Sequence, residues 1–350
     1  MRILVEKSNA DLNTPDLWGR TPLSYAAFYG NQGVARILLE QNDIDPNIAE
    51  DNGTTPIAFA AGKGDEEMVR ILLGRSDVNP NIADTIYGQT PLAWAALIAQ
   101  EGVVRVLLER NDVDPNIADQ NARTPISFAA GNGHEEIVRI LLGRSDVDPN
   151  IADTVFGKTP LSFAAEKGHE GVVRVLLERN DVNLQKVDQS GSTPLSRAAR
   201  SGHKGVARIL LERNGVSPET ANIDGRTPLS LAAQRGHQGV VRILLGRNEV
   251  DPNAADKNGR TPLYWVARGG SEKVVRMLLK RNDLNLGATD VCGQRAASRA
   301  AHNGHHSIAK LLRERASLAR RYAASRQPTG PGFHRLSTPR RPPFKRIRRF

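Results

Sequence analysis

The sequence is poor in cysteine, in aromatic residues and in long apolar runs. Its 350 residues include one cysteine, Cys292, which excludes an intramolecular disulfide and fits a reducing compartment. No segment approaches the ~20 consecutive apolar residues of a membrane-spanning helix, so we predict no membrane span. Aromatic residues make up only 5% of the chain. One compact core rarely grows beyond about 250–300 residues, whereas an array of repeats escapes that limit because each unit contacts only its neighbours.

Motifs of catalysis and cofactor binding are also missing. The chain has neither a glycine-rich phosphate loop nor a His-Glu-x-x-His motif. The serines that recur after the repeated Thr-Pro, beginning with Ser24, have no paired base that recurs near them. Cys292 has two histidines close by in the sequence, His302 and His305, but the repeat pattern is degenerate there. We therefore predict a protein that is not an enzyme and needs no cofactor.

Repetition is what the sequence has in abundance. The stretch GRTPLSYAA at residues 19–27 returns in near copies, and the threonines of these copies are 34 or 35 residues apart. A fixed period of this size indicates a stacked array of structural repeats. The threonines are Thr21, Thr55, Thr90, Thr124, Thr159, Thr193, Thr227 and Thr261.

Each copy carries the signals of a helix start. Threonine is a good N-cap, proline suits the first helical position, and the following Leu/Ile and Ala-Ala pair fall on one helical face. A glycine such as Gly30 ends this first helix, a second helix such as residues 169–178 follows, and a polar tip ends in a glycine such as Gly19. The pattern predicts a helix–turn–helix unit with a projecting β-turn.

These residues resemble the ankyrin repeat. Residues 225–233, Gly236-His237, residues 240–245 and Val250-Asp251 match the family's pattern in order, and the resemblance covers residues 2–315. It implies an all-α solenoid of about nine repeats that acts as a non-catalytic scaffold for protein partners. The proposed binding surface is the concave face with the tips, and we expect a monomer in the cytoplasm or the nucleus.

Several departures from the family pattern carry structural expectations. The family's histidine after Thr-Pro-Leu is replaced by Ser or Ala in most copies, so the His–Thr hydrogen bond that the resemblance implies should be lost. Ala99 stands where other copies have glycine, which requires a costly backbone conformation or a longer helix. Residues 295–297, Arg-Ala-Ala, replace Thr-Pro-Leu, which weakens the last unit as expected of a terminal cap.

Three regions follow from the pattern. Residues 1–20 are a partial repeat with the first tip and residues 21–315 the array. Residues 316–350 are a disordered, basic, proline-rich tail, with the alternative that the second helix of the last unit runs into it as far as Ala323. The chain begins inside a repeat, as a worn cap or as a piece of a longer protein, and its first turn should be frayed and poorly protected from hydrogen exchange. The net charge of +10 lies entirely in the tail, which holds ten basic and no acidic residues.

Two repeated rows of polar side chains have structural explanations. Histidines begin the second helix in five copies, where other copies have the N-cap residues Asn31, Asp65 and Ser271, so we predict capping and no metal site. A row of arginines that begins at Arg36 is matched by glutamates four residues earlier in several copies, which predicts a neutral outer face and no nucleic-acid surface. The histidines are His134, His169, His203, His237 and His305.

The candidate partner-binding residues are those that vary while the frame repeats. Trp18, Tyr87 and Phe156 precede the tip glycine in three copies, 69 residues apart. Each either folds against its own hairpin or forms part of an apolar comb that faces a partner. The end of the first helix grades from apolar to basic along the chain, through Phe28 and Tyr29, Leu97 and Ile98, and then Arg200, Arg235 and Arg268. We hypothesise that the N-terminal half binds an apolar segment and the C-terminal half an acidic one.

The tail offers a rival function. Its last residues include the basic cluster Lys345, Arg346, Arg348 and Arg349. Such a cluster is an inert solubilising tail, a nuclear-import signal, or a contact for nucleic acid or an anionic membrane surface. The alternative function is therefore a nuclear or polyanion-binding protein that acts through this tail.

Overall fold

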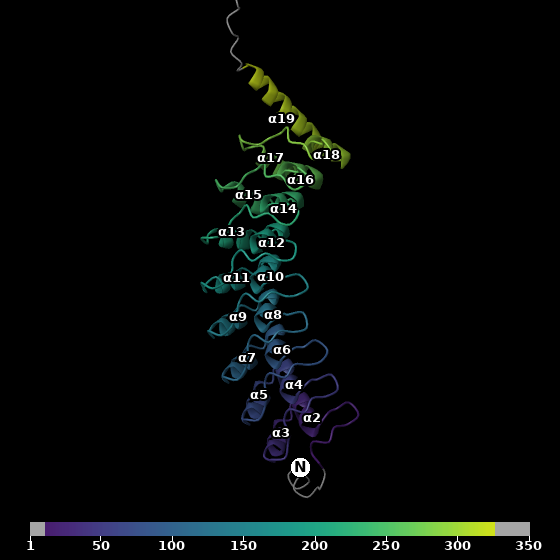
Figure 1. Cartoon of the computed structure of the whole chain (residues 1–350), viewed down its shortest axis with the longest axis vertical. Helices are drawn as coiled ribbons and strands as arrows, with labels where there is room; N and C mark the ends of the chain where they lie inside the picture. The colour runs from purple at the N-terminus through teal and green to yellow at the C-terminus, as the bar shows by residue number, and fades with distance from the viewer. Residues whose placement is uncertain (1–10, 326–350) are drawn as a thin grey trace, which may run out of the picture.

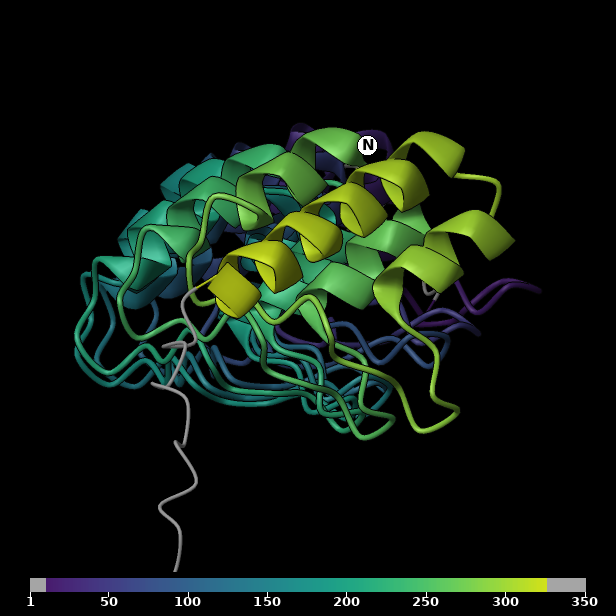
Figure 2. The same ribbon diagram turned by 90° about the horizontal axis from the view of Figure 1, so that it is seen from above.

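The computed structural model describes residues 11–325 as one elongated stack of helix pairs (Figure 1). Residues 11–325 contain 18 helices and no strand beyond one isolated bridge, which confirms the predicted all-α solenoid. We number the nine helix pairs as units 1 to 9, each with the tip that precedes it. Seen along the stack, the first and second helices form two adjacent rows, and the loops that include the tips extend below them (Figure 2).

The helices of each unit are short and regular. The first helices are α2 (Pro22–Tyr29), α4 (Pro56–Lys63), α6 (Pro91–Leu97), α8 (Pro125–Asn132), α10 (Pro160–Lys167), α12 (Pro194–Ser201), α14 (Pro228–Arg235), α16 (Pro262–Gly269) and α18 (Ala296–His302). The second helices are α3 (Gln32–Leu39), α5 (Glu66–Leu73), α7 (Glu101–Leu108), α9 (Glu135–Leu142), α11 (Glu170–Leu176), α13 (Lys204–Leu211), α15 (Gln238–Leu245), α17 (Glu272–Leu278) and α19 (His306–Ser325).

The Thr-Pro pair starts the first helices as predicted. In α2, the Oγ1 of Thr21 accepts a hydrogen bond from the Ser24 N–H at 3.2 Å, and Pro22 takes the first helical position. The helix ends at Gly30, whose φ of 71° lies in the left-handed region. The same N-cap bond forms in most other units, so local sequence sets where the first helices begin.

In several units a serine hydroxyl contacts the cap threonine in place of the lost histidine bond. The Ser24 hydroxyl lies 3.1 Å from the Oγ1 of Thr21, and Ser127 and Ser196 make the same contact with their own cap threonines. A serine hydroxyl is shorter than an imidazole, but it sits one turn from the threonine on the same helix. The first turn of these helices therefore contains a side-chain contact between the serine and the cap threonine.

One continuous core runs through the stack. The first helices of units 1 to 7 bury a Leu or Ile and an Ala-Ala pair, as Leu92, Ala95 and Ala96 do in α6, and the second helices bury a stripe of aliphatic residues. Because alanine side chains are small, the Ala-Ala pair allows neighbouring first helices to pack closely. None of these short helices could bury its apolar face alone, so stacking supplies the stability.

A row of asparagines joins successive units on the side of the second helices. Asn47 donates from Nδ2 to the carbonyl of Asp77 at 2.8 Å and accepts at Oδ1 from the N–H of Asn79 at 2.7 Å. We call this row the asparagine ladder. Its equivalent positions are Asn13, Asn47, Asn81, Asn116, Asn150, Gln185, Glu219, Asn253 and Gly287. Gln185 keeps only the donor bond, to the carbonyl of Gly215 at 3.1 Å, and Glu219 replaces the amide, so the ladder is weakened between units 6 and 8.

The tips are also tied together. The carbonyl of Trp18 accepts from the N–H of Asp51 at 3.1 Å, and the equivalent bond recurs from tip to tip up to Asn258 and Val291 at 2.9 Å. Arginines at the ends of second helices reach back as well, as when Arg247 donates to the carbonyl of Leu211 at 2.8 Å. These bonds fix the spacing of the tips.

The histidines join units instead of capping helices. Their side chains make no cap bond, which corrects the prediction; the Nε2 of His203 lies 2.9 Å from the carbonyl oxygen of Glu166 in the preceding unit. Among the second helices, Asp65 does cap α5, by accepting from the N–H of Met68 at 3.0 Å. Within residues 11–325, no group of three His, Cys, Asp or Glu side chains is arranged to hold a metal ion.

The array ends later than residue 315. Helix α19 continues to Ser325, so the first residues assigned to the tail are helical. The predicted frayed first turn lies in residues 1–10 and the basic cluster Lys345, Arg346, Arg348 and Arg349 in residues 326–350, both outside the described residues.

Replacing Ala99 with glycine should stabilise the protein. Ala99 has a φ of 66°, in the left-handed region where a Cβ is strained and the other units have glycine. We expect the free energy of unfolding to rise by about 1 kcal/mol, measured by urea unfolding. Ala122→Gly, at a tip with a φ of 58°, should act in the same direction. Ala95→Gly, inside α6, is the control and should destabilise; a loss of stability in Ala99→Gly would contradict the strain.

Candidate interaction surface

The predicted partner-binding residues lie on the side of the stack formed by the tips and the first helices, which we call the tip face. At the tips, Trp18 is 63% exposed and Tyr87 and Phe156 are each 53% exposed. Tyr87 makes an edge contact with Trp94, with ring centres 6.2 Å apart, and the Lys158 ammonium lies 4.6 Å from the ring centre of Phe156. Both rings therefore contact their own unit and still present half of their surface to solvent.

Each exposed tip aromatic follows an exposed aliphatic residue. Leu17 is 94% exposed, Ile86 53% and Val155 48%. The intervening tips carry Asn52 and Asn121 at the aromatic position. Units 1, 3 and 5 therefore present apolar pairs at alternate tips, and the tip-to-tip hydrogen bonds hold them in register. The aliphatic member of each pair was not predicted, because it stands two residues before the tip glycine and the aromatic residue stands directly before it.

A second aromatic row lies behind the tips, on the first helices. Its members stand four residues after the cap threonine in units 1 to 5, and most are half-buried. This row was not predicted, although it is visible in the sequence once the copies are aligned on their threonines. The residues are Tyr25, Phe59, Trp94, Phe128 and Phe163, followed in units 6 to 9 by Arg197, Leu231, Trp265 and Arg299.

A buried acidic residue shapes most tips and couples them to this row. Asp84 accepts from the N–H groups of Ile86 and Gln89 at 3.0 Å, and from the indole Nε1 of Trp94 at 3.1 Å. In unit 1 the hydroxyl of Tyr25 donates to Asp16 at 2.7 Å, which lowers the pKa of Asp16 and raises the pKa of Tyr25. A hydrogen-bonded carboxylate thus orients both the tip and the inner side chain.

The predicted apolar helix ends are only partly free. Phe28 is half-buried against Phe59, with ring centres 5.4 Å apart, and the Lys63 ammonium lies 4.1 Å from the Phe28 ring centre. Tyr29 is 65% exposed. In unit 3, Ile98 is exposed and Leu97 is half-buried. The accessible apolar surface at these ends therefore comes mainly from Tyr29 and Ile98.

The basic helix ends lie at the other half of the tip face. Arg200, Arg235 and Arg268 are exposed at the C-terminal ends of α12, α14 and α16. Cations are favourable at helix C-termini, which gives each a structural role. In the part of the chain that the structure describes, none of the three forms a salt bridge, so their charge is not locally neutralised.

The arginine row on the second helices is neutralised as predicted in three units, and pairs across units add to this. Arg70, Arg139 and Arg276 pair with the glutamate four residues earlier, at 3.1, 3.4 and 2.7 Å. Arg70 and Arg139 also pair across units with Glu109 and Glu178, at 3.1 and 3.2 Å. These ion pairs neutralise parts of the second-helix side, whereas units 6 to 8 of the tip face keep unpaired cations.

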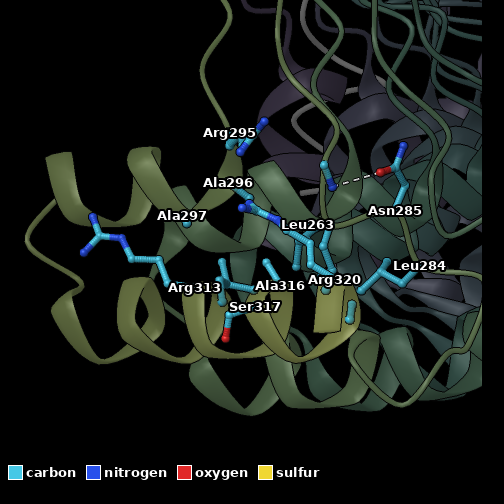
Figure 3. Close-up of a pocket in the computed structure, with 14 residues that line it drawn as sticks. Leu263, Leu284, Asn285, Arg295, Ala296, Ala297, Arg313, Ala316, Ser317 and Arg320 are labelled. Carbon is cyan, nitrogen blue, oxygen red and sulfur yellow. Dashed lines mark hydrogen bonds between the residues drawn. The ribbon is translucent and has the colours of Figure 1, made fainter. Parts of the chain in front are cut away.

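A cavity of about 650 Å³ opens at the end of the stack (Figure 3). Leu263 and Leu284 line it from unit 8, and Arg295, Ala297 and Arg320 from unit 9. It exists because Ala297 stands where the other units bury a Leu or Ile. The lining residues include no histidine, cysteine or carboxylate that could act as a base or a nucleophile.

The stacked helix pairs and the tip face define the class of protein: the chain is a helical-repeat solenoid with an extended, partly apolar surface. The family model described as ankyrin repeats (3 copies) matches residues 42–119, 97–186, 126–222, 180–256 and 229–321, and the single ankyrin repeat matches residues 18–51. The chain belongs to the ankyrin repeat family. Its repeats support a role in protein–protein interaction. The comparison with curated proteins finds no match. No helix in residues 11–325 is long and apolar enough to cross a membrane.

Proposed function

We propose that the tip face is the surface on which this protein holds a protein partner, as a non-catalytic scaffold. The observation that carries the proposal is the set of apolar pairs at the tips of units 1, 3 and 5, of which Trp18, Tyr87 and Phe156 are the aromatic members. Aromatic side chains are favoured anchors at interfaces, because they bury a large area at a low entropic cost. Rigid spacing by the tip-to-tip hydrogen bonds preorganises them for one ligand.

Charge divides the tip face into two halves. The first half carries the aromatic row of units 1 to 5, and the second half carries the exposed cations Arg200, Arg235 and Arg268 at the ends of the first helices. An apolar segment of the partner suits the first half and an acidic segment the second. The protein would then act in the cytoplasm or the nucleus, as a monomer that binds one partner along its length.

Trp18→Ala/Tyr87→Ala/Phe156→Ala should abolish partner capture. The change removes three side chains that are each more than half exposed, so the free energy of unfolding should change little. Affinity purification with mass spectrometry, compared with the parent chain, measures the loss. The matched control is Ile223→Ala/Val291→Ala, which removes apolar tip residues that are 56% and 70% exposed in the other half.

A second set of variants tests the basic half. Arg200→Glu/Arg235→Glu should weaken the same partner by charge repulsion. If neither this pair nor the aromatic triple loses any partner, the tip face is not the binding surface.

The basic tail is the alternative. Its ten basic residues and the absence of acidic ones favour a polyanion target or nuclear import. Deleting residues 326–350 leaves α19 intact and discriminates the two proposals. A scaffold keeps its partner after this deletion, whereas a protein that acts through the tail loses its target.

A further inference from the structure

The residue before the cap threonine is a cation in five tips, and three of these cations pair closely with a carboxylate. Arg20 lies 2.5 Å from Glu50, Arg123 lies 2.9 Å from Asp119, and Lys158 lies 2.5 Å from Glu166. In unit 8, the Nε of Arg260 is 4.0 Å from Asp290. Among the described residues, Arg226 in unit 7 forms no salt bridge.

Arg226 is held in place without a counter-ion. Its guanidinium carbon lies 3.9 Å from the ring centre of Trp265, and its terminal nitrogen donates to the Gln234 side-chain oxygen. Its Nε is buried and has no hydrogen-bond partner. Burial lowers the pKa of Arg226, and the nearby Arg200 and Arg268 contribute in the same direction. Such a cation is destabilised until an anion binds it.

The other charges around Arg226 leave a position for an anion. Arg200 and Arg268 flank it from α12 and α16, and Arg268 also lies 5.3 Å from the Trp265 ring centre. The nearest carboxylates are Asp224 and Asp256. Asp256 is engaged by the Trp265 indole at 3.1 Å and by backbone N–H groups of its own tip. Asp224 is the exposed residue before the tip glycine and forms no salt bridge with Arg226.

We infer that Arg226, which is held on the Trp265 ring and flanked by Arg200 and Arg268, binds an aspartate or glutamate side chain of an acidic partner segment. This inference rests on the proposed function of the tip face and gives its basic half one anchoring site. Because its Nε is buried, Arg226 would offer the N–H donors of its two terminal nitrogens to a carboxylate, and the aromatic ring holds the guanidinium plane in orientation. The array outside the tail is formally neutral, with 38 basic and 38 acidic residues, which favours a local contact with a peptide over a polyanion.

The test is direct binding of a fluorescein-labelled peptide of alternating glycine and glutamate to the full chain, measured by anisotropy. Arg226→Gln should weaken binding by about tenfold or more, because hydrogen bonds to charged groups are among the strongest in proteins. Arg226→Lys should restore only part of the affinity. The matched control is Arg242→Gln, in the same unit on the exposed side of α15, which should leave binding unchanged.

Each contrary outcome has a distinct meaning. Equal losses in Arg226→Gln and Arg242→Gln, or a loss in neither, would overturn the site. Displacement of the peptide by a single-stranded oligonucleotide in an Arg226-dependent way would overturn the carboxylate assignment. Because the peptide is measured without the cellular partner, this result is independent of the capture experiments, and only the failure of both the aromatic triple and Arg200→Glu/Arg235→Glu in those experiments would overturn the proposed function.

Discussion

Glu219→Asn is expected to stabilise the array most strongly above neutral pH. Glu219 occupies a position of the asparagine ladder, where an amide would accept from one backbone N–H of the next unit and donate to a carbonyl. A carboxylate can accept from the N–H of Asp251 but has no proton to donate, and its Oε1 is buried without a partner. An asparagine restores both bonds, as Asn253 shows one unit later, where it donates to the carbonyl of Asp283 at 2.8 Å and accepts from the N–H of Asn285 at 2.7 Å.

The pH dependence follows from the pKa of Glu219. Burial, with the like charges of Asp251 and Glu249, raises this pKa from 4.5 to about 7. Below pH 4.5 the carboxyl is protonated in both the folded and the unfolded chain, so the cost of burying its charge is absent. Between pH 4.5 and about 7 the unfolded chain ionises this carboxyl while the folded chain keeps its proton, so stability falls across this window and stays low above it. At 1.36 kcal/mol per unit, discounted for partial solvent exposure, the loss is about 1–2 kcal/mol.

Urea unfolding at pH 5 and pH 8 measures this effect. The gain in the free energy of unfolding from Glu219→Asn should be larger at pH 8 than at pH 5. The control is Gln185→Asn, which repairs the neighbouring ladder position without removing a titrating group and should give the same gain at both values. An equal gain from Glu219→Asn at both pH values would show that the carboxyl does not titrate in the ladder.

Arg197→Leu should lower the free energy of unfolding by about 3 kcal/mol, the largest loss that we predict. The Nε of Arg197 donates to Asp188 at 2.5 Å, and its terminal nitrogen donates to Ser190 at 3.1 Å. Both Arg197 and Asp188 are buried. Burial raises the pKa of Asp188, but the hydrogen bonds from Arg197 and Ser190 outweigh it and hold that pKa below its usual value. Removing the arginine leaves an ionised carboxylate buried without its partner.

The neighbouring unit supplies the rescue. There, Leu231 takes the position of Arg197, and the tip has Asn222 in place of the aspartate. Asn222 still accepts from the N–H of Arg226 at 2.9 Å, so an amide shapes the tip without burying a charge. Asp188→Asn/Arg197→Leu should therefore recover most of the stability lost in Arg197→Leu. A double variant as unstable as the single one would contradict the buried-charge explanation, and urea unfolding of all three chains provides the comparison.

The sequence predicts the parts of this fold that short-range chemistry decides. A threonine followed by proline and then by the Leu/Ile and Ala-Ala positions starts a helix, and the left-handed φ of Ala99 follows from the glycine that it replaces. The histidines could not be assigned correctly, because His203 meets the carbonyl of Glu166 only after two units have stacked. Glu219 likewise resembles any surface glutamate until the ladder positions are known.

Only part of the candidate surface was predictable from the sequence, because several of its contacts form only in the folded stack. Trp18, Tyr87 and Phe156 stood out because they break the pattern at a single position. Whether they bind a partner is still a prediction. The pairing of Asp188 with Arg197, nine residues apart, needs the tip to fold back over the first helix, and the isolation of Arg226 depends on which carboxylates its neighbours already hold.

The break in the asparagine ladder has a mechanical consequence. From Asn13 to Asn183 each successive pair of units shares two amide bonds, and the same bonds resume at Asn253. The rod is thus stiff on either side of a softer joint, which falls where the surface changes from apolar to basic. Under tension the protein should bend first at this joint. A partner that binds both halves of the array can then change the distance between its two contact sites without unfolding the units on either side.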